Sequence, residues 1–302
     1  MTTMMLNIAA ENFAHILVAR LVAYLSTRTR DWAPTHEELM EALATPAPAP
    51  APAPPRRRRA MTHEHASQVN REGHAEEHMF AHVLGPDAEV KSGTSKPDVR
   101  QGAEFYSVKK HGIKIQWGLH GHKFLTAIPI PLTRLLVDCI DVYPATFNAY
   151  VQDKKTTYAL LAPRMVALKE HLHDKTAMGE FLSLFMRGRN KEVTRLAMAN
   201  NSRYAVFCID EIVQLLVSTL VAENSKARHK GQNDHQKVVL KAPKSRGSPV
   251  SVFEIEMRHD SNTHYRELLV TSLRDPFFTF MISRLQLTST RGVIDYYGTT
   301  KA

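Results

Sequence analysis

The sequence predicts an α/β fold with a mixed central sheet flanked by helices, preceded by an N-terminal helical appendage. Of the 302 residues, 43% are hydrophobic, which is enough to bury a sizeable core. Segments with helical spacing of apolar residues occur together with short strand-like segments along the same chain. An Ala/Pro run at 46–55 separates a small N-terminal part from the remainder.

The helical appendage is predicted at residues 1–45, because apolar residues recur there at roughly helical spacing. They are Leu6, Ile8, Phe13, Ile16, Leu17, Leu21 and Leu25. Alternating proline then favours an extended, solvated spacer, which continues into Arg56–Arg59. We therefore expect an Ala/Pro and Arg linker at 46–60 and the main domain at 61–302.

The main domain is expected to open with a helix followed by three strands. Phe80, Val83 and Leu84 form the apolar face of a predicted helix, His74–Leu84. Glycine, proline and serine then separate short strand-like segments. These segments are Glu89–Lys91, Pro97–Gln101 and Glu104–Lys109.

The rest of the main domain is expected to be mixed. Ile128–Ile130 and Leu135–Val142 fit either buried strand or helix, and helices are predicted at Tyr158–His171, Met178–Met186 and Ala205–Ala222. The basic stretch Asn224–Gly247 has few apolar residues and predicts a loop or ribbon outside the core. Val250–Met257 and Tyr265–Ser272 alternate as strands and are expected to pair as a hairpin.

Charge and cysteine content narrow the class of protein. The 39 Lys and Arg residues exceed the 30 Asp and Glu residues, giving a formal charge of +9. Such an excess favours a polyanionic partner, although a basic protein without one is the simpler alternative. No apolar run reaches the roughly 18 residues of a membrane span. Cys139 and Cys208 lie in separate apolar stretches and predict reduced thiols in the cytoplasm.

Asp98 and Lys109 are the residues that most suggest chemistry. A tight turn at Gly102 would place their two strands side by side, and Ser107 would share a face with Lys109 by the period of two. Phosphodiester hydrolysis needs a carboxylate-bound divalent cation and a group that positions the attacking water. The alternative is a simple cross-strand ion pair at the surface.

Two segments resemble the PD-(D/E)xK nuclease superfamily, and type II restriction endonucleases within it. They are Lys96-Pro97-Asp98-Val99 and Glu104-Phe105-Tyr106-Ser107-Val108-Lys109-Lys110. The resemblance covers residues of about 70 to 125. In that family the first Asp and a second acidic residue bind metal, Lys follows two positions later, and a Glu often comes from the preceding helix. The resemblance implies a restriction-endonuclease-like core.

This sequence departs from the family at Ser107, which stands at the second acidic position. Hydroxyl oxygen is a poorer metal ligand than carboxylate. Carried over, Asp98 and Glu77 would bind Mg²⁺, with the backbone carbonyl of Val108 as a third oxygen. Glu76 is the rival for the helix carboxylate.

The resemblance also implies roles for the remaining residues. Lys109 would orient or activate the attacking water, and Ser107 would be a weak or water-mediated ligand. Gln116 would bind a phosphate or the water network. DNA contacts are expected from two sets of basic residues, which are Lys110 and Lys114 near the motif and Arg228, Lys230, Lys244 and Arg246 in a candidate recognition part, 224–302.

The resulting expectation is a Mg²⁺-dependent endonuclease that cleaves double-stranded DNA. As a type II restriction enzyme it would act as a homodimer on a symmetric site. A DNA methyltransferase would be its partner in a restriction-modification system. Two other classes stay open. His74, Glu77 and His78 match the HxxEH motif of inverted zinc peptidases. A non-catalytic DNA-binding protein that has lost acidity at Ser107 is the other.

Overall fold

The computed structural model describes residues 63–91, 96–110, 112–200, 202–227, 234–243, 248–258 and 264–298, with side chains from residue 71 onward. The predicted appendage and linker at 1–60 lie outside the described residues. So do four of the predicted DNA contacts, Arg228, Lys230, Lys244 and Arg246.

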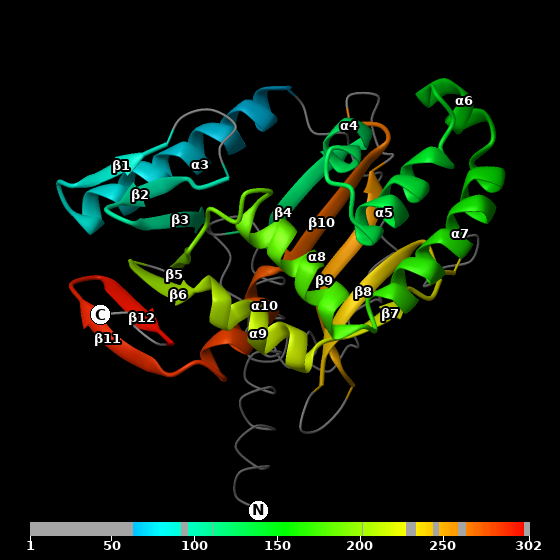
Figure 1. Cartoon of the computed structure of the whole chain (residues 1–302). Coiled ribbons are helices and arrows are strands. Elements are labelled where there is room, and N and C mark those ends of the chain that lie inside the picture. The colour runs from blue at the N-terminus through cyan, green and yellow to red at the C-terminus, as the bar shows by residue number, and fades with distance from the viewer. Residues whose placement is uncertain are drawn as a thin grey trace, which may run out of the picture. The chain divides into compact units, whose positions relative to one another are not determined.

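The described residues form a mixed α/β architecture with two sheets (Figure 1). The first sheet has seven strands in the order β1-β2-β3-β5-β6-β12-β11, and the second has five in the order β4-β10-β9-β8-β7. The first sheet is mixed, because β3 pairs with β5 and β6 with β12 in parallel while the other pairs are antiparallel. The second sheet is antiparallel throughout.

The strands of the first sheet are β1 (Ala88–Val90), β2 (Val99–Gln101), β3 (Glu104–Lys109), β5 (Arg195–Asn200), β6 (Arg203–Cys208), β11 (Leu287–Arg291) and β12 (Ile294–Tyr297). Those of the second are β4 (Lys114–Gly121), β7 (Val221–Asn224), β8 (Lys237–Ala242), β9 (Val250–Arg258) and β10 (Glu267–Leu273).

Local sequence signals set several helix ends. The Asp174 side chain accepts a hydrogen bond from the Ala177 amide at the start of α8, and Gly188 ends that helix with a φ of 84°. The helices are α3 (His63–Leu84), α4 (His122–Thr126), α5 (Pro131–Asp141), α6 (Phe147–Gln152), α7 (Lys154–His171), α8 (Lys175–Arg187), α9 (Ile209–Thr219) and α10 (Arg274–Ile282).

Helix α3 covers one face of the first sheet. Its Phe80 is fully buried, and the Phe80 ring centre lies 5.3 Å from that of Tyr106 on β3 and 4.9 Å from that of Tyr204 on β6. Val99 and Val108 belong to the same apolar cluster. The even-numbered side chains of β3 therefore face α3, and Ser107 and Lys109 face the other way.

The opposite face of the first sheet shares a core with the second sheet. Leu196 and Phe207 from the first sheet belong to one buried cluster with Trp117 and Phe253 from the second and with residues of α8 and α9. Burying both faces of β5 and β6 removes the polar alternation that marks a half-exposed strand. The site described below lies on this inner side.

Most of the elements expected from the sequence are present. The strand Glu104–Lys109 has the predicted bounds, and α3 ends at Leu84 as expected but begins at His63. Segment Leu135–Val142 is helical as far as Asp141, where α5 ends. The expected hairpin is confirmed by β9 and β10, which pair antiparallel from Glu267 with Arg258 to Ser272 with Phe253.

Four expectations are wrong. Ile128–Ile130, expected as buried strand or helix, lies in the connection between α4 and α5. The other three concern the sheets. Ala205–Ala222 is not one helix, because β6, α9 and β7 divide it. The stretch Asn224–Gly247 contains β8, whose Val238 and Leu240 are fully buried. Five strands form a second sheet that the expected single central sheet did not include. In these three cases burial on both faces, or pairing with distant strands, replaced the expected periodicity.

Among the described residues, no helix combines the length and apolarity needed to span a lipid bilayer. Cys139 and Cys208 are free thiols, as the sequence predicted. Cys139 is buried in α5, where burial raises the pKa of its thiol to about 12, so this side chain is an apolar packing group.

Candidate active site

The β2–β3 hairpin places Asp98 opposite Ser107. Gly102, with a φ of 57°, allows the tight turn, and Gln101 pairs with Glu104 across it. The Asp98 amide donates to the Tyr106 carbonyl at 2.8 Å, which continues the ladder one residue beyond β2. Adjacent strands therefore hold Asp98 opposite Ser107, whereas the sequence predicted that they would place Asp98 beside Lys109.

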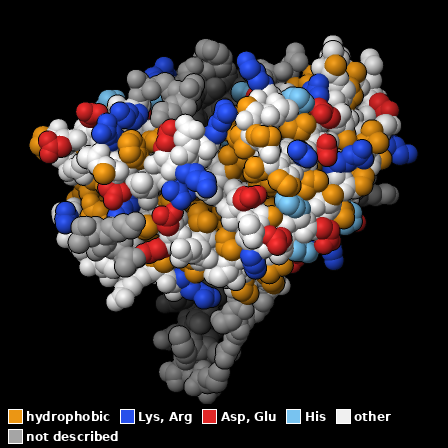
Figure 2. Space-filling view, viewed as in Figure 1, with side chains coloured by type: hydrophobic (Ala, Val, Ile, Leu, Met, Phe, Trp, Pro, Cys, Tyr) orange, Lys and Arg blue, Asp and Glu red, His pale blue; other side chains and the backbone are white. Residues whose placement is uncertain are grey.

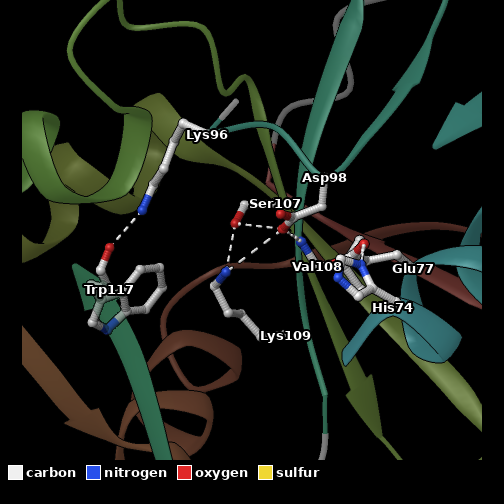
Figure 3. Close-up of polar contacts among 8 residues, drawn as sticks. All are labelled: His74, Glu77, Lys96, Asp98, Ser107, Val108, Lys109 and Trp117. Carbon is white, nitrogen blue, oxygen red and sulfur yellow. Dashed lines mark hydrogen bonds and ion pairs between the residues drawn. The ribbon is translucent and has the colours of Figure 1, made fainter. Parts of the chain in front are cut away.

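The carboxylate of Asp98 is the centre of a hydrogen-bonded group (Figure 3). Its Oδ2 accepts from the Ser107 hydroxyl at 3.1 Å and from the Val108 amide at 2.7 Å. The Lys109 Nζ donates to the Ser107 Oγ at 2.7 Å and lies 3.7 Å from the Asp98 Oδ2. The hydroxyl of Ser107 thus links the two charged groups.

This group is partly withdrawn from solvent. The side chains of Asp98 and Lys109 are 22% and 17% exposed, and Ser107 is 1% exposed. Removing two opposite charges from water is unfavourable unless hydrogen bonds within the protein compensate for the lost hydration. All contacts of the Asp98 carboxylate use Oδ2, so among the described residues Oδ1 has no partner and is available to a ligand.

Lys96 is a residue that the sequence reading did not single out. Its Nζ donates to the Trp117 carbonyl at 2.6 Å, across the space between the two sheets. Burial, and then repulsion by Lys109, lowers the pKa of Lys96 to about 7, whereas Asp98 acts in the opposite direction. Lys96 belongs to the segment Lys96-Pro97-Asp98-Val99, but no local sequence pattern predicts its contact with Trp117.

His120 lies near this cluster on β4. Its ring stacks on Phe124 with centres 3.9 Å apart and contacts Phe185. Burial, and then the positive charge of Lys96, lowers the pKa of His120 to about 4. The imidazole is therefore neutral near pH 7 and packs as an aromatic ring.

The two candidate carboxylates on α3 differ in their contacts. Glu76 accepts a hydrogen bond from the Tyr204 hydroxyl at 2.5 Å. Glu77 is 16% exposed, and its Oε2 lies 3.0 Å from the Nδ1 of exposed His74. In the view of Figure 3, Glu77 lies on the other side of β3 from Ser107 and Lys109. No hydrogen bond or ion pair recorded among the described residues joins Glu77 to Asp98.

Three other predicted site residues lie apart from this group. Gln116 is exposed on β4, in the second sheet, and is not joined to Asp98 or Lys109 by a recorded contact within the described part of the chain. Lys110 pairs with Glu72 at 3.0 Å, and Lys114 pairs with Glu254 at 3.4 Å. In this structure each of these two lysines forms an ion pair with a glutamate of the same chain.

The residues present fit Mg²⁺ better than Zn²⁺. Within the described ranges, no group of three or more His, Cys, Asp or Glu side chains is arranged to hold a metal ion. His74 and His78 therefore belong to no such group. A zinc site needs three protein ligands or more. Magnesium commonly takes one or two carboxylates and completes its shell with water and phosphate oxygens, and Asp98 offers one such carboxylate beside Lys109.

The surface charge gives no single DNA-binding patch on the face seen in Figure 2. Lys and Arg side chains are spread among Asp and Glu over both sheets and their helices. Ion pairs such as Lys237–Glu256 and Arg187–Asp210 also neutralise basic side chains within the described residues.

Comparison with known proteins returned no match to a protein-family model, to a curated protein or to a solved structure.

Proposed function

We propose that this protein is a Mg²⁺-dependent endonuclease that cleaves double-stranded DNA. The observation that carries the proposal is the contact of Asp98, Ser107 and Lys109 at the paired ends of β2 and β3. A carboxylate with a free oxygen and an ammonium within 3.7 Å of it supply the two kinds of group that phosphodiester hydrolysis requires.

The burial of the group favours a catalytic role over a surface ion pair. An exposed Asp–Lys pair contributes little to stability, and a partly buried one has a desolvation cost. Ser107, almost fully buried between the two charges, gives the Lys109 ammonium a fixed direction. A fixed ammonium can act on a reacting group without first reorganising.

In the proposed mechanism Asp98 would hold the cation. Glu77, proposed as the second ligand, lies on the other side of β3 in this structure and would have to turn toward Asp98 to bind it. Bound Mg²⁺ offsets the negative charge that develops on the phosphate. Lys109 donates hydrogen bonds to the attacking water and stabilises charge on the phosphate oxygens. Ser107 orients Lys109, and the Val108 amide orients the Asp98 carboxylate. Water attacks phosphorus and releases a proton to solvent, the P–O3′ bond breaks, the leaving O3′ takes up a proton from solvent, and the products carry a 5′-phosphate and a 3′-hydroxyl.

The finer proposal is a type II restriction endonuclease that acts as a homodimer on a symmetric site, with a DNA methyltransferase as its system partner. It is supported by the resemblance of the motif and by the basic balance of the chain. A two-fold DNA site is matched by a two-fold protein. Lys110, Lys114 and the basic stretch within 224–247 are the proposed DNA contacts.

The experiment is digestion of a sequenced genomic DNA with the full-length protein and Mg²⁺, followed by mapping of the ends. Discrete ends that recur at one sequence support the proposal, and random nicking supports a nuclease that is not site-specific. The Asp98→Ala and Lys109→Ala proteins should not cut, and the site assignment is wrong if both cut normally.

Two further results would replace the proposal. Stoichiometric zinc in the purified protein, lost in a His78→Ala variant, would indicate the peptidase class. Tight, salt-sensitive DNA binding without any nicking would indicate a non-catalytic DNA-binding protein.

A further inference from the structure

Lys96 connects the first sheet to the second. It lies two residues before Asp98, and its Nζ donates to the Trp117 carbonyl on β4 at 2.6 Å. Strand β4 is an edge strand, and its pairing with β10 skips Trp117, passing from Gly118 with Val270 to Gln116 with Thr271. An edge strand leaves backbone groups without a strand partner, and Lys96 supplies a donor to one of them.

The alkyl chain of Lys96 is held by the end of α8. A Cβ built on Gly188 would lie 2.8 Å from both the Cβ and the Cγ of Lys96. That distance is far shorter than an ordinary carbon–carbon contact of about 3.5 to 4.0 Å. The absence of a side chain at Gly188 therefore makes the space through which Lys96 passes.

Trp117 also contacts the second lysine of the site. The Lys109 Nζ lies 5.9 Å from the centre of the indole ring, within the range of a cation–π contact. The ring is fixed in turn, because Trp117 Nε1 donates to the Ser272 Oγ at 2.8 Å and the side chain is 1% exposed. A single rigid residue of β4 thus contacts both lysines.

These contacts form a closed ring. It runs from Asp98 through Ser107 and Lys109 to Trp117, then through Lys96 and along the chain back to Asp98 (Figure 3). We propose that Lys96 is a positioning residue: by tying the segment that carries Asp98 to the residue that underlies Lys109, it fixes the separation of the Asp98 carboxylate and the Lys109 ammonium. The catalytic consequence rests on the proposed nuclease function, whereas the coupling to Trp117 does not.

The variant that tests this is Lys96→Met, which keeps an unbranched apolar chain beside Gly188 and removes the donor. Lys175→Met is the matched control, because Lys175 Nζ also donates to a backbone carbonyl, that of Leu220, at 3.2 Å. Unfolding in urea measures how much stability each variant loses. DNA affinity is measured with Ca²⁺ in place of Mg²⁺, and cleavage is measured in a single turnover with excess protein.

Lys96→Met is expected to slow single-turnover cleavage by about tenfold or more, because a small misplacement of reacting groups costs rate rather than affinity. DNA affinity should stay within about threefold, and Lys175→Met should cleave within about twofold of the wild type. Cleavage by Lys96→Met at the wild-type rate, or a loss no larger than that of Lys175→Met, overturns the proposal.

A second readout does not need cleavage. The chain has 2 tryptophans, Trp32 and Trp117, so a Trp32→Phe background isolates the emission of Trp117. Lys96→Met is expected to change the intensity of that emission by altering the distance of the Lys109 ammonium from the ring, and Lys175→Met should not. Unchanged emission in Lys96→Met overturns the coupling. If the wild type does not cleave DNA, the nuclease proposal fails while this readout still decides the role of Lys96.

Discussion

The Lys109 ammonium lies 3.7 Å from the Asp98 carboxylate, and the Ser107 hydroxyl contacts both groups. The two charged residues come from different strands, and the ladder between β2 and β3 sets their separation. This geometry gives Lys109 a direction that neighbouring lysines do not share, and it leads to predictions that distinguish each residue of the site.

The adjacent lysines should behave differently. Lys109→Met should reduce the single-turnover cleavage rate by about a hundredfold or more, since it removes a fixed cation from the reacting phosphate. Lys110→Met is the matched control, because Lys110 pairs with Glu72 at the surface. It should weaken DNA binding by a few-fold at about 0.1 M salt and leave the rate nearly unchanged. Equal losses of rate in the two variants would contradict the assignment.

The neighbouring glutamates of α3 should separate in the same way. Glu77→Gln should raise the Mg²⁺ concentration needed for half-maximal cleavage, because it removes a proposed ligand. Glu76→Gln should instead lower the free energy of unfolding by about 1 kcal/mol, since it weakens the contact with Tyr204. Magnesium titrations of cleavage and urea unfolding distinguish them. If Glu76→Gln alone shifts the Mg²⁺ requirement, the helix ligand is Glu76.

Ser107 can be tested by removing its hydroxyl and by replacing it with an acidic residue. Ser107→Ala should lower the free energy of unfolding by about 1 to 2 kcal/mol, because a buried hydroxyl with two partners is lost. Thr157→Val is the control, because it removes another buried hydroxyl far from Asp98 along the chain. Cleavage should be slowed by Ser107→Ala and unaffected by Thr157→Val.

Ser107→Asp should place a second carboxylate beside Asp98. Their repulsion lowers stability without metal, and a bound cation relieves it. Added Mg²⁺ should therefore raise the melting temperature of Ser107→Asp more than that of the wild type. An equal response of both proteins to Mg²⁺ would mean that no cation binds next to Asp98.

His120 predicts a pH dependence of stability. Its pKa falls from 6.5 to about 4 on folding, chiefly through burial. Between these values the unfolded chain binds a proton that the folded protein does not, so stability falls as the pH drops through this window. The loss is on the order of 3 kcal/mol once both states are below their pKa values.

A His120→Phe variant keeps the ring that stacks on Phe124 and has no proton to bind. Urea unfolding at about pH 7 and about pH 4 should show a smaller loss in this variant than in the wild type. His82→Phe, at an exposed position of α3, is the control and should keep the wild-type loss. Identical losses in wild type and His120→Phe would contradict the assignment of this pH dependence to His120.

The sequence predicted which side chains meet in the β2–β3 hairpin better than it predicted the surrounding fold. Asp98, Ser107 and Lys109 lie within a hairpin, where a local turn and the period of two determine which side chains meet. Most of strand β6 falls within the helix expected at Ala205–Ala222, because an apolar run without alternation fits either structure. The run has no alternation because both faces of β6 are buried.

Local sequence patterns do not predict contacts between segments that lie far apart along the chain. Lys96 and Trp117 are separated by 21 positions and belong to different sheets. The pairing of β3 with β5 likewise joins strands that lie far apart along the chain. Such pairings follow from packing of the whole core rather than from local propensity.

The most direct test of the nuclease site is the single-turnover cleavage rate of Asp98→Asn with Mg²⁺. Asp275→Asn, at a carboxylate that is 86% exposed, is the matched control. We predict that Asp98→Asn lowers the rate by about a hundredfold or more and binds DNA with Ca²⁺ within about threefold of the wild type, while Asp275→Asn cuts normally. Cleavage by Asp98→Asn at the wild-type rate would contradict the account.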